Sequence, residues 1–312
     1  MNEKNNTSEI ENAEQSEKKE IVPKKITIIG SGFVGKAAGK GFLSFGHDVS
    51  FVDINELLIE KLSKEGFESC NIGAKCAHDR DIYMVSVLTP TINDHLDFRF
   101  IESALASLGQ ALAENTNRPL VVIRSTVPPG TVENRFVPIL EKYSGKKLGE
   151  GFDVAMNPEF LREVSAEEDF MHPWVVVIGS NNPKVGQVME DLYRPFGAPI
   201  FHMTIKEAEF MKYVHNIYNA SKISFFNEMR SVAQAVGADA DKVFKVVTES
   251  AEASWNKKYG IRDFGPYDGS CLPKDTLAFM SWANEEAKKK MPLLHAVIRV
   301  NENLKDKQYL EY

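Results

Sequence analysis

The chain has 312 residues, of which 43% are hydrophobic and 26% charged, and its net charge is −7. This is the composition of a globular protein with room for two domains and a sizeable core. The negative charge argues against binding to nucleic acid or to an anionic membrane surface. No apolar run has the length of a membrane span, and three cysteines are too few for a disulfide framework. We therefore predict a cytoplasmic protein in a reducing compartment.

Residues 1–24 are rich in Asn, Glu, Ser and Lys and almost free of large apolar side chains. Such a segment cannot bury enough apolar surface to fold, and it lacks the apolar centre of a signal peptide. We predict a disordered tail over residues 1–24.

Between residues 25 and 203, short apolar runs alternate with segments that have helical periodicity. Several of the runs lack polar alternation, as expected of strands that are buried on both faces of a parallel sheet. This alternation predicts an α/β domain with a doubly wound, Rossmann-like parallel sheet over residues 25–203. The predicted strands are 26–29, 49–52, 82–88, 120–123, 152–156 and 174–178, with helices that include 36–43, 55–62 and 185–192.

The pattern changes after Met203. Residues 204–235 form one helical pattern without proline or glycine, and Gly237 is a plausible helix stop. Further helical runs occupy 241–248, 276–283 and 293–304. We predict a second, mostly helical domain with a long central helix over residues 204–312.

The first predicted strand leads into Gly-Ser-Gly-Phe-Val-Gly at residues 30–35, and a helix follows. These glycines allow a tight turn, approach of a pyrophosphate to the backbone, and close packing of helix on strand. Asp53 ends the second strand about 20 residues further on, where a carboxylate accepts hydrogen bonds from ribose hydroxyls and repels a 2′-phosphate. The motif predicts NAD, bound by Gly30, Gly32, Phe33, Val34, Gly35 and Asp53.

Hydroxyl side chains follow two later strands, at Thr89 and Thr126. Ligands of open α/β sheets lie beyond the carboxyl ends of the strands, so both hydroxyls are candidates to bond cofactor or water. Each is also a common turn former, which is the alternative interpretation.

Two further groups of charged and amide side chains are candidates for a part in catalysis. Glu159 and Glu163 follow the fifth strand and share a face if the segment is helical. On the long helix, Glu209, Lys212 and Asn216 share one face, and the last two are suited to holding an oxyanion. A solvated row of charges is the alternative in each case.

Cys271 precedes a predicted helix, with Lys274 and Asp275 in its first turn. A helix N-terminus and a nearby cation both favour the thiolate, which is the nucleophilic form. A buried apolar cysteine is the alternative. There is no His-x-x-x-His pair, so no metal site is predicted.

Taken in order, Gly-Ser-Gly-Phe-Val-Gly35, Ser-Thr126-Val-Pro-Pro-Gly, Asn-Pro-Glu159-Phe-Leu-Arg-Glu163, Lys212-x-x-x-Asn216 and Gly-Ser-Cys271-Leu-Pro-Lys-Asp275 resemble the UDP-glucose/GDP-mannose dehydrogenase family. The resemblance covers about residues 25–304. It implies an NAD-dependent oxidation of a nucleotide sugar, UDP-glucose first, from the C6 alcohol to the carboxylate. It also implies a thiohemiacetal and a thioester on the cysteine, and a homodimer formed through the helical domain.

The resemblance also implies individual roles. Cys271 corresponds to the nucleophile, Lys212 and Asn216 to the oxyanion-binding pair, Asp275 to the support of the lysine and water, and Glu159 and Thr126 to the residues that manage water. NAD contacts are implied for Thr89, Thr126, Glu163 and Lys274 besides the glycine motif and Asp53. The implied substrate-binding residues are Glu159, Phe160, Leu161, Lys212, Asn216 and Cys271.

The chain departs from the family in two respects. Asp268 stands where the family usually has a glycine, and a side chain there narrows the loop before Cys271. The C-terminal nucleotide-binding domain of the family is also expected to be lacking.

Two other functions fit the sequence. One is an NAD-binding relative with weak or no activity. The other is a β-hydroxyacid-type dehydrogenase, which transfers a single hydride and uses a lysine without a cysteine.

Overall fold

The computed structural model describes residues 21–74, 77–92, 95–250, 266–268, 272–285 and 287–305. The chain divides into two compact units, of which the first ends at Tyr213 and the second begins at Val214. Of the predicted disordered tail, residues 1–20 lie outside the described residues, and residues 21–24 lead into the first strand.

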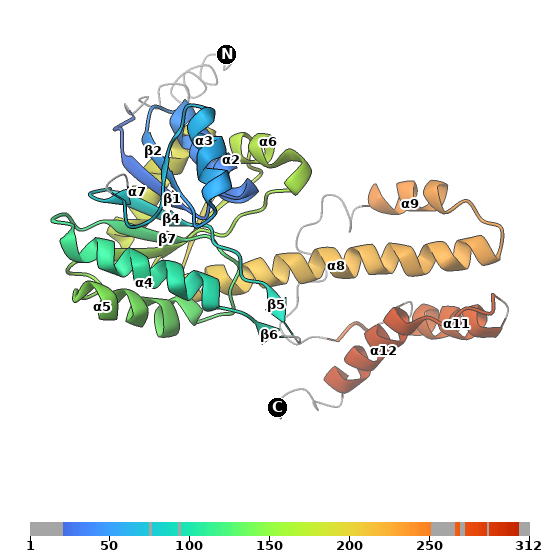
Figure 1. Cartoon of the computed structure of the whole chain (residues 1–312). Helices are drawn as coiled ribbons and strands as arrows, with labels where there is room; N and C mark the ends of the chain where they lie inside the picture. The colour runs from blue at the N-terminus through green and yellow to red at the C-terminus, as the bar shows by residue number, and fades with distance from the viewer. Residues whose placement is uncertain are drawn as a thin grey trace, which may run out of the picture. The chain divides into compact units, whose positions relative to one another are not determined.

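The first unit is built on an eight-stranded sheet with the order β10-β9-β8-β7-β4-β1-β2-β3 (Figure 1). From β3 to β8 this is the strand order of a dinucleotide-binding fold. The strands pair in parallel except for β8 and β9, which are antiparallel and meet at Met156 and Gly179. The bounds are β1 Lys25–Ile29, β2 Asp48–Val52, β3 Glu68–Cys70, β4 Ile82–Val85, β7 Leu120–Ile123, β8 Asp153–Met156, β9 Val176–Gly179 and β10 Ile200–Met203.

The predicted α/β fold class is therefore confirmed, with local corrections. The strand predicted at 82–88 ends at Val85, because the neighbouring strands β1 and β7 end at the same level and leave no backbone to pair with. The strand predicted at 174–178 begins at Val176, and Trp174 is 62% exposed. Strands β3 and β10 and a small hairpin were not predicted, since they are short or partly exposed; the hairpin strands are β5 Thr91–Ile92 and β6 His95–Leu96.

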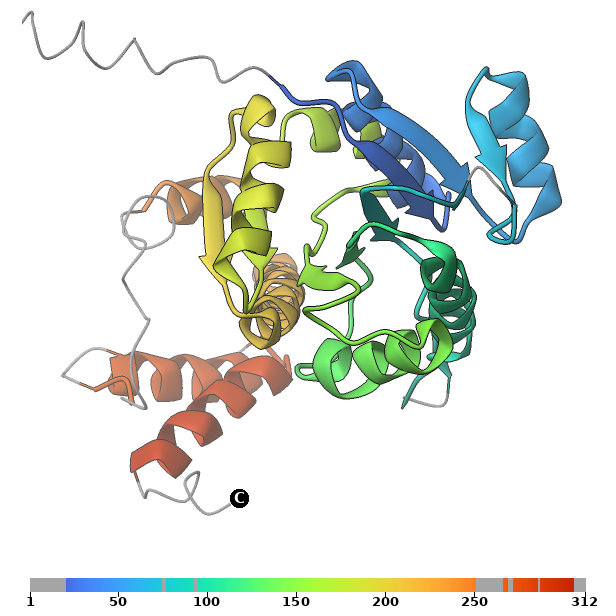
Figure 2. The same cartoon turned by 90° about the vertical axis from the view of Figure 1, so that its left-hand side faces the viewer.

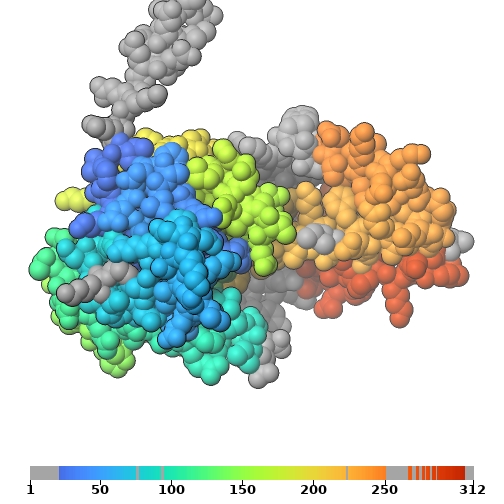
Figure 3. Space-filling model, turned by 45° about the horizontal axis from the view of Figure 1, so that its top comes forward, coloured from blue at the N-terminus to red at the C-terminus, as the bar shows by residue number. Residues whose placement is uncertain are grey.

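Helices cover both faces of the sheet. On one face, α4 and α5 bury Leu105, Leu108 and Leu140 against the strands. On the other face, α2, α3, α6 and α7 form a second core, in which Phe42 and Met189 are fully buried. Figure 2 separates the green α4 and α5 from the yellow α7, and Figure 3 shows the blue-to-green residues of this unit as one continuous packed surface. The helices are α2 Phe33–Ser44, α3 Glu56–Lys64, α4 Arg99–Glu114, α5 Val137–Ser144, α6 Ala166–Met171 and α7 Pro183–Tyr193, with a π-helical segment at Val132–Phe136 and 3₁₀ turns at Glu163–Ser165 and Arg194–Phe196.

The second unit is helical, as predicted. Helix α8, Ile205–Ala235, begins in the first unit and ends just before Gly237, which has the left-handed φ of 70° that a helix stop requires. The other helices are α9 Ala240–Thr248, α11 Leu272–Glu285 and α12 Pro292–Lys305. A small core joins Val232 of α8 to Ala283 and Met291. Among the described residues, no helix combines the length and apolar character needed to cross a membrane.

Phe42 is the centre of the second core. Its ring makes edge contacts with Phe170, Tyr193 and Phe196 at centroid distances of 5.3, 5.5 and 6.0 Å, so it joins α2, α6 and the end of α7. Such aromatic pairs add about 0.5–1.5 kcal/mol each beyond the burial of their area.

We expect Phe42→Ala to lower the free energy of unfolding by about 3–5 kcal/mol, since it leaves a cavity among rings that cannot collapse together. Urea denaturation followed by circular dichroism measures the change. Phe201→Ala is the matched control, because Phe201 is 56% exposed. Equal losses for the two variants would contradict this description of the core.

Candidate functional site

The turn after β1 leaves an open position at the N-terminus of α2. Gly30 has a φ of 86°, and a Cβ there would lie 2.7 Å from the carbonyl oxygen of Ser86. A Cβ on Gly35 would collide with the carbonyl oxygen of Gly30, so both positions require glycine. Gly32 is the N-cap of α2, has open space beside it and makes no side-chain cap. The first amides of α2 are thus available to an anionic group.

Asp53 follows β2 and is held by two backbone amides. One carboxylate oxygen accepts from the N–H of Ser31 at 2.8 Å and the other from the N–H of Asn55 at 2.9 Å. Each oxygen keeps a lone pair for a further donor, such as a ribose hydroxyl.

A cavity of about 370 Å³ lies at these strand ends. Gly30, Gly32 and Asp53, which were predicted to bind NAD, line its polar side, and their role stays a prediction. Its apolar wall was not predicted, and it includes Ile54, Leu58, Ile72, Phe100 and Ala104. The spacing of Phe100, Ser103, Ala104 and Ser107 on α4 is helical, and this pattern was the available signal.

The two predicted threonines come together. The Thr89 hydroxyl donates to the carbonyl oxygen of Thr126 at 3.0 Å, which joins the loops after β4 and β7. Both side chains are partly buried.

Lys212 and Glu159 form a buried pair. The Lys212 ammonium donates to the carbonyl oxygen of Glu159 and lies 3.3 Å from its carboxylate, and the Lys212 side chain is only 7% exposed. It also lies 5.0 Å from the centre of the Phe160 ring. The other carboxylate oxygen of Glu159 accepts from the N–H of Leu161 at 2.7 Å. The arrangement places a fixed cation and a fixed carboxylate side by side, the combination that can stabilise an oxyanion and orient water.

Glu159 and Glu163 were expected to share a face only if their segment were helical, and the structure does not meet this condition. The chain from 157 to 162 has no regular secondary structure, and Glu163 begins a separate 3₁₀ turn where its side chain is exposed. The buried side chain of Asn157 holds this segment: its amide donates to the carbonyl of Val177 at 2.8 Å, and it accepts from the Tyr193 hydroxyl at 2.6 Å. Tertiary hydrogen bonds to β9 and α7 thus replace those of a helix.

Glu209 on α8 is a functional candidate to which the sequence analysis gave no role of its own. Its carboxylate is fully buried and accepts from the backbone N–H groups of Gly130 and Val132, the second at 2.8 Å. Burial raises the pKa of Glu209, and the two amide donors act in the opposite direction. Glu209 therefore fixes the loop after Thr126 to the helix that carries Lys212.

The remaining predicted residues belong to the second unit. Asn216 lies on α8, one turn beyond Lys212, and is exposed. Cys271 lies outside the described residues. For Lys274 and Asp275 the structure describes the helical backbone of the first turn of α11 but not the side chains.

Within the described part of the chain, no three His, Cys, Asp or Glu side chains are grouped as a metal ion requires. Cys70, which ends β3, is disulfide-bonded, and the prediction of reduced cysteines did not anticipate this.

Two sequence models match the chain. Residues 67–197 match the NAD binding domain of the UDP-glucose/GDP-mannose dehydrogenase family, and residues 206–303 match its central domain. GDP-mannose 6-dehydrogenase of Pseudomonas aeruginosa is 34% identical over 306 residues, which cover 91% of this chain and 70% of that protein. UDP-glucose 6-dehydrogenase of Haloferax volcanii is 32% identical over 305 residues, which cover 89% and 69%.

Solved structures agree with these matches. A ternary complex of GDP-mannose dehydrogenase from Pseudomonas aeruginosa has a TM-score of 0.85, at 34% identity, over 90% of this chain and 69% of that one. UDP-glucose dehydrogenase from Pyrobaculum islandicum has a TM-score of 0.71, at 32% identity, over 91% and 69%. The predicted cofactor, NAD, is confirmed.

We expect Glu209→Gln to destabilise the protein by about 1–3 kcal/mol, because one of the two buried amides loses its acceptor. Folding raises the pKa of the Glu209 carboxyl group. The group therefore stabilises the folded state most strongly at pH values below its unfolded pKa, and this contribution declines as the pH rises through its folded pKa. The difference between wild type and Glu209→Gln in urea denaturation should therefore shrink as the pH rises above the ordinary carboxyl value of about 4.5. An unchanged difference would contradict the assignment, and Glu60→Gln, an exposed residue of α3, is the control.

Proposed function

Because the chain belongs to the UDP-glucose/GDP-mannose dehydrogenase family, we propose that it oxidises C6 of a nucleotide sugar from an alcohol to a carboxylate. The observation that carries this proposal is the buried Lys212–Glu159 pair at the carboxyl edge of the sheet, the edge on which the predicted cofactor cavity also lies. The whole reaction converts one alcohol, two NAD⁺ and one water into a carboxylate, two NADH and three protons.

Bound NAD accepts a hydride in each of the two oxidation steps. Lys212 stabilises the oxygen of C6 as negative charge develops on it, and a fixed ammonium in a dry site does this without reorganisation. Asn216 is proposed as a second donor to the same oxygen. Lys212 is already oriented by the carbonyl of Glu159, so its position does not depend on the substrate.

The thiolate of Cys271 is proposed to attack the aldehyde carbon, which forms a C–S bond and a thiohemiacetal. Oxidation of this adduct gives a thioester. Attack by water then breaks the C–S bond, releases the carboxylate and returns the thiol. A covalent intermediate divides one difficult oxidation into easier steps. Glu159 is the proposed base for this water, Thr126 its positioning group, and Asp275 the support of Lys212 and water.

Several of the proposed cofactor-binding residues lie in the described part of the chain. Gly32, Phe33 and Val34 offer the N-terminus of α2 to the pyrophosphate, and Asp53 offers its carboxylate to a ribose. Thr89, Thr126, Glu163 and Lys274 are further proposed cofactor contacts, and the backbone of Phe160 and Leu161 is proposed to line the sugar site.

The substrate is proposed by similarity. UDP-glucose is the sugar predicted from the sequence, whereas the greater structural similarity to a GDP-mannose dehydrogenase favours GDP-mannose. Both sugars therefore belong in the same assay.

We expect the active sugar to yield two NADH per molecule consumed, measured by absorbance at substrate exhaustion. Cys271→Ser should reduce this steady-state oxidation by about 100-fold or more, because the thioester intermediate cannot form without the thiolate. Ser281→Ala, an exposed change in α11, should leave it unchanged. One NADH per sugar with an active Cys271→Ser variant would indicate a single hydride transfer and refute the thioester mechanism.

A homodimer is proposed from the surface of the second unit. Val214, Ile217, Tyr218 and Phe225 follow one stripe of α8, and each is between 43% and 63% exposed. A continuous apolar stripe of this kind is typical of a protein interface, and a second copy of the chain has the same stripe to pack against it.

Light scattering after size exclusion should give twice the chain mass of 35.0 kDa. Ile217→Asp with Phe225→Asp should give the monomer mass, because an interface with buried, unpaired carboxylates is unstable. Lys61→Asp, an exposed change on α3, should remain a dimer. A wild-type monomer would overturn the proposal.

A further inference from the structure

Trp174 is a large aromatic residue that the proposed function does not use. It lies just before β9 and is 62% exposed, so most of its surface contributes nothing to the core. Its backbone is nevertheless well held: Pro173 precedes it, and Val175 after it is buried in the core beneath α4 and α5. An aromatic side chain on a fixed backbone can serve as a support for its neighbours.

The indole of Trp174 contacts the ring of Phe160. The two ring centres are 5.2 Å apart, and the rings meet edge to face at an angle of 61°. The Phe160 ring also lies against Lys212, whose ammonium is 5.0 Å from the ring centre. All three residues belong to the first unit. One aromatic ring therefore connects Trp174 to the ammonium that the proposed mechanism uses.

The position of the Phe160 ring depends on side-chain packing. Residues 157–162 have no regular secondary structure, so no ladder of backbone hydrogen bonds fixes the orientation of Phe160. Its ring is only partly buried and packs against the edge of the core. Removal of the indole would leave space beside the ring, and the ring could then turn away from Lys212.

The Phe160 ring also limits the access of water to Lys212. An ammonium has three N–H donors, and Glu159 can accept two of them, through its carbonyl and its carboxylate. At least one donor remains for the oxygen at C6 of the sugar. Because the Lys212 side chain is only 7% exposed, few water molecules compete for that donor. An aromatic ring beside the ammonium preserves this condition without competing as a strong acceptor.

We propose that Trp174 is a positioning residue for the oxidation. It supports the Phe160 ring, and this ring keeps the Lys212 ammonium fixed and shielded from water. A fixed and shielded cation stabilises the developing charge on the sugar oxygen more strongly than a mobile, hydrated one. This inference rests on the proposed function, because it assumes that Lys212 binds this oxygen.

Steady-state kinetics with the active nucleotide sugar tests the role in the reaction. We expect Trp174→Ala to lower kcat about tenfold and to change KM by less than about twofold, because the charge on the oxygen develops only in the transition state. Trp174→Phe should restore kcat, since a phenyl ring can make the same edge contact. Phe201→Ala, which removes an exposed aromatic side chain from the neighbouring strand β10, should leave both constants unchanged.

A double-mutant cycle tests the route through Phe160. In a Phe160→Leu background, Trp174→Ala should have no further effect on kcat, because the ring through which the indole acts is already absent. Independent, additive losses would contradict this route. A large rise in KM at unchanged kcat would also overturn the proposal, because Trp174 would then bind the sugar directly.

Chemical labelling tests the same contact without any substrate. The full chain is treated with sulfosuccinimidyl acetate, and the rate of acetylation of each lysine is followed by mass spectrometry of its peptides. Trp174→Ala should accelerate the acetylation of Lys212 several-fold, and Trp174→Phe should not. Lys206, an exposed residue of the same helix, is the control and should react at the same rate in all three proteins.

Unchanged acetylation of Lys212 in Trp174→Ala would overturn the proposal, whatever the kinetics show. Faster acetylation of Lys212 in a wild-type chain that oxidises neither sugar would instead refute the proposed function and leave the packing of these rings correct. The two failures are therefore distinguishable.

Discussion

Two buried charged side chains, one helical turn apart at the start of α8, connect the helix to the edge of the sheet where the chemistry is proposed. Glu209 holds the backbone of the loop after β7, and Lys212 holds the carbonyl and carboxylate that follow β8. Removal of one partner from a buried charge pair costs about 3–5 kcal/mol. The positions of both loops therefore depend on how α8 docks, and the helix gives the reactive groups a rigid support.

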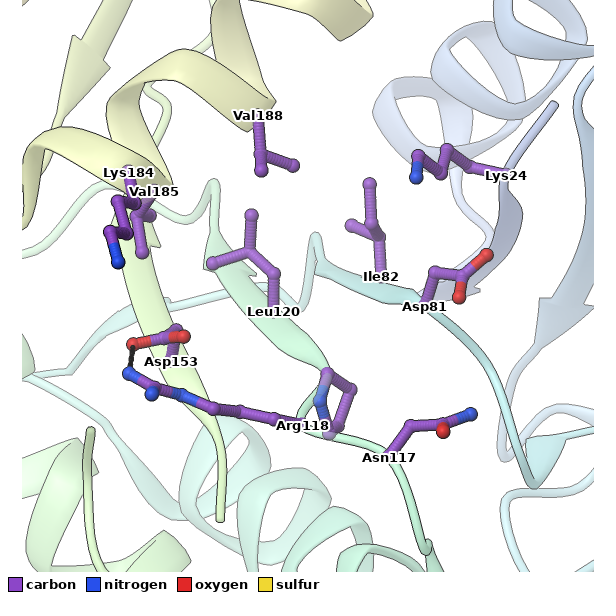
Figure 4. A pocket seen from close by; sticks show the side chains of 11 residues that line it. Lys24, Asp81, Ile82, Asn117, Arg118, Leu120, Asp153, Lys184, Val185 and Val188 are labelled. Atoms are coloured by element: carbon purple, nitrogen blue, oxygen red, sulfur yellow. Dashed lines mark hydrogen bonds and ion pairs between the residues drawn. The ribbon is translucent and has the colours of Figure 1, made fainter. Parts of the chain in front are cut away.

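The two edges of the sheet have different surfaces, because most of its strands run in the same direction. At the carboxyl ends of the strands, turns and loops leave backbone amides and Asp53 facing an open cavity, as in other open α/β folds. At the amino ends, charged side chains lie at or just before the first residues of β1, β4 and β8, at Lys24, Asp81 and Asp153 (Figure 4). The parallel arrangement thus accounts for the position of the proposed oxidation site at one edge of the sheet.

The glycine motif, Asp53 and the long helix were predictable, because each depends on local constraints: a tight turn, a strand end and an uninterrupted periodicity. The apolar wall from α4 and the role of Glu209 were not, because both depend on residues far apart in the chain that meet only after folding. The conformation of the segment that carries Glu159 and Glu163 could not be predicted for the same reason. Asn157 and Lys212 make tertiary contacts that hold the segment without a helix. The roles of Cys271, Lys274 and Asp275 remain predictions.

The most direct test of the central claim is the turnover of a Lys212→Met variant, in which an unbranched side chain one atom shorter replaces the lysine and the charge is lost. NAD affinity and the urea midpoint are measured on the same sample, with Lys206→Met on the same helix as the control. We expect sugar-dependent NAD reduction to fall about 100-fold or more while NAD affinity is retained, because the developing oxyanion loses its cation. The urea midpoint reports the separate loss of the contacts between Lys212 and Glu159. Turnover within a few-fold of the wild type would contradict the assignment of the reactive centre to the buried ammonium.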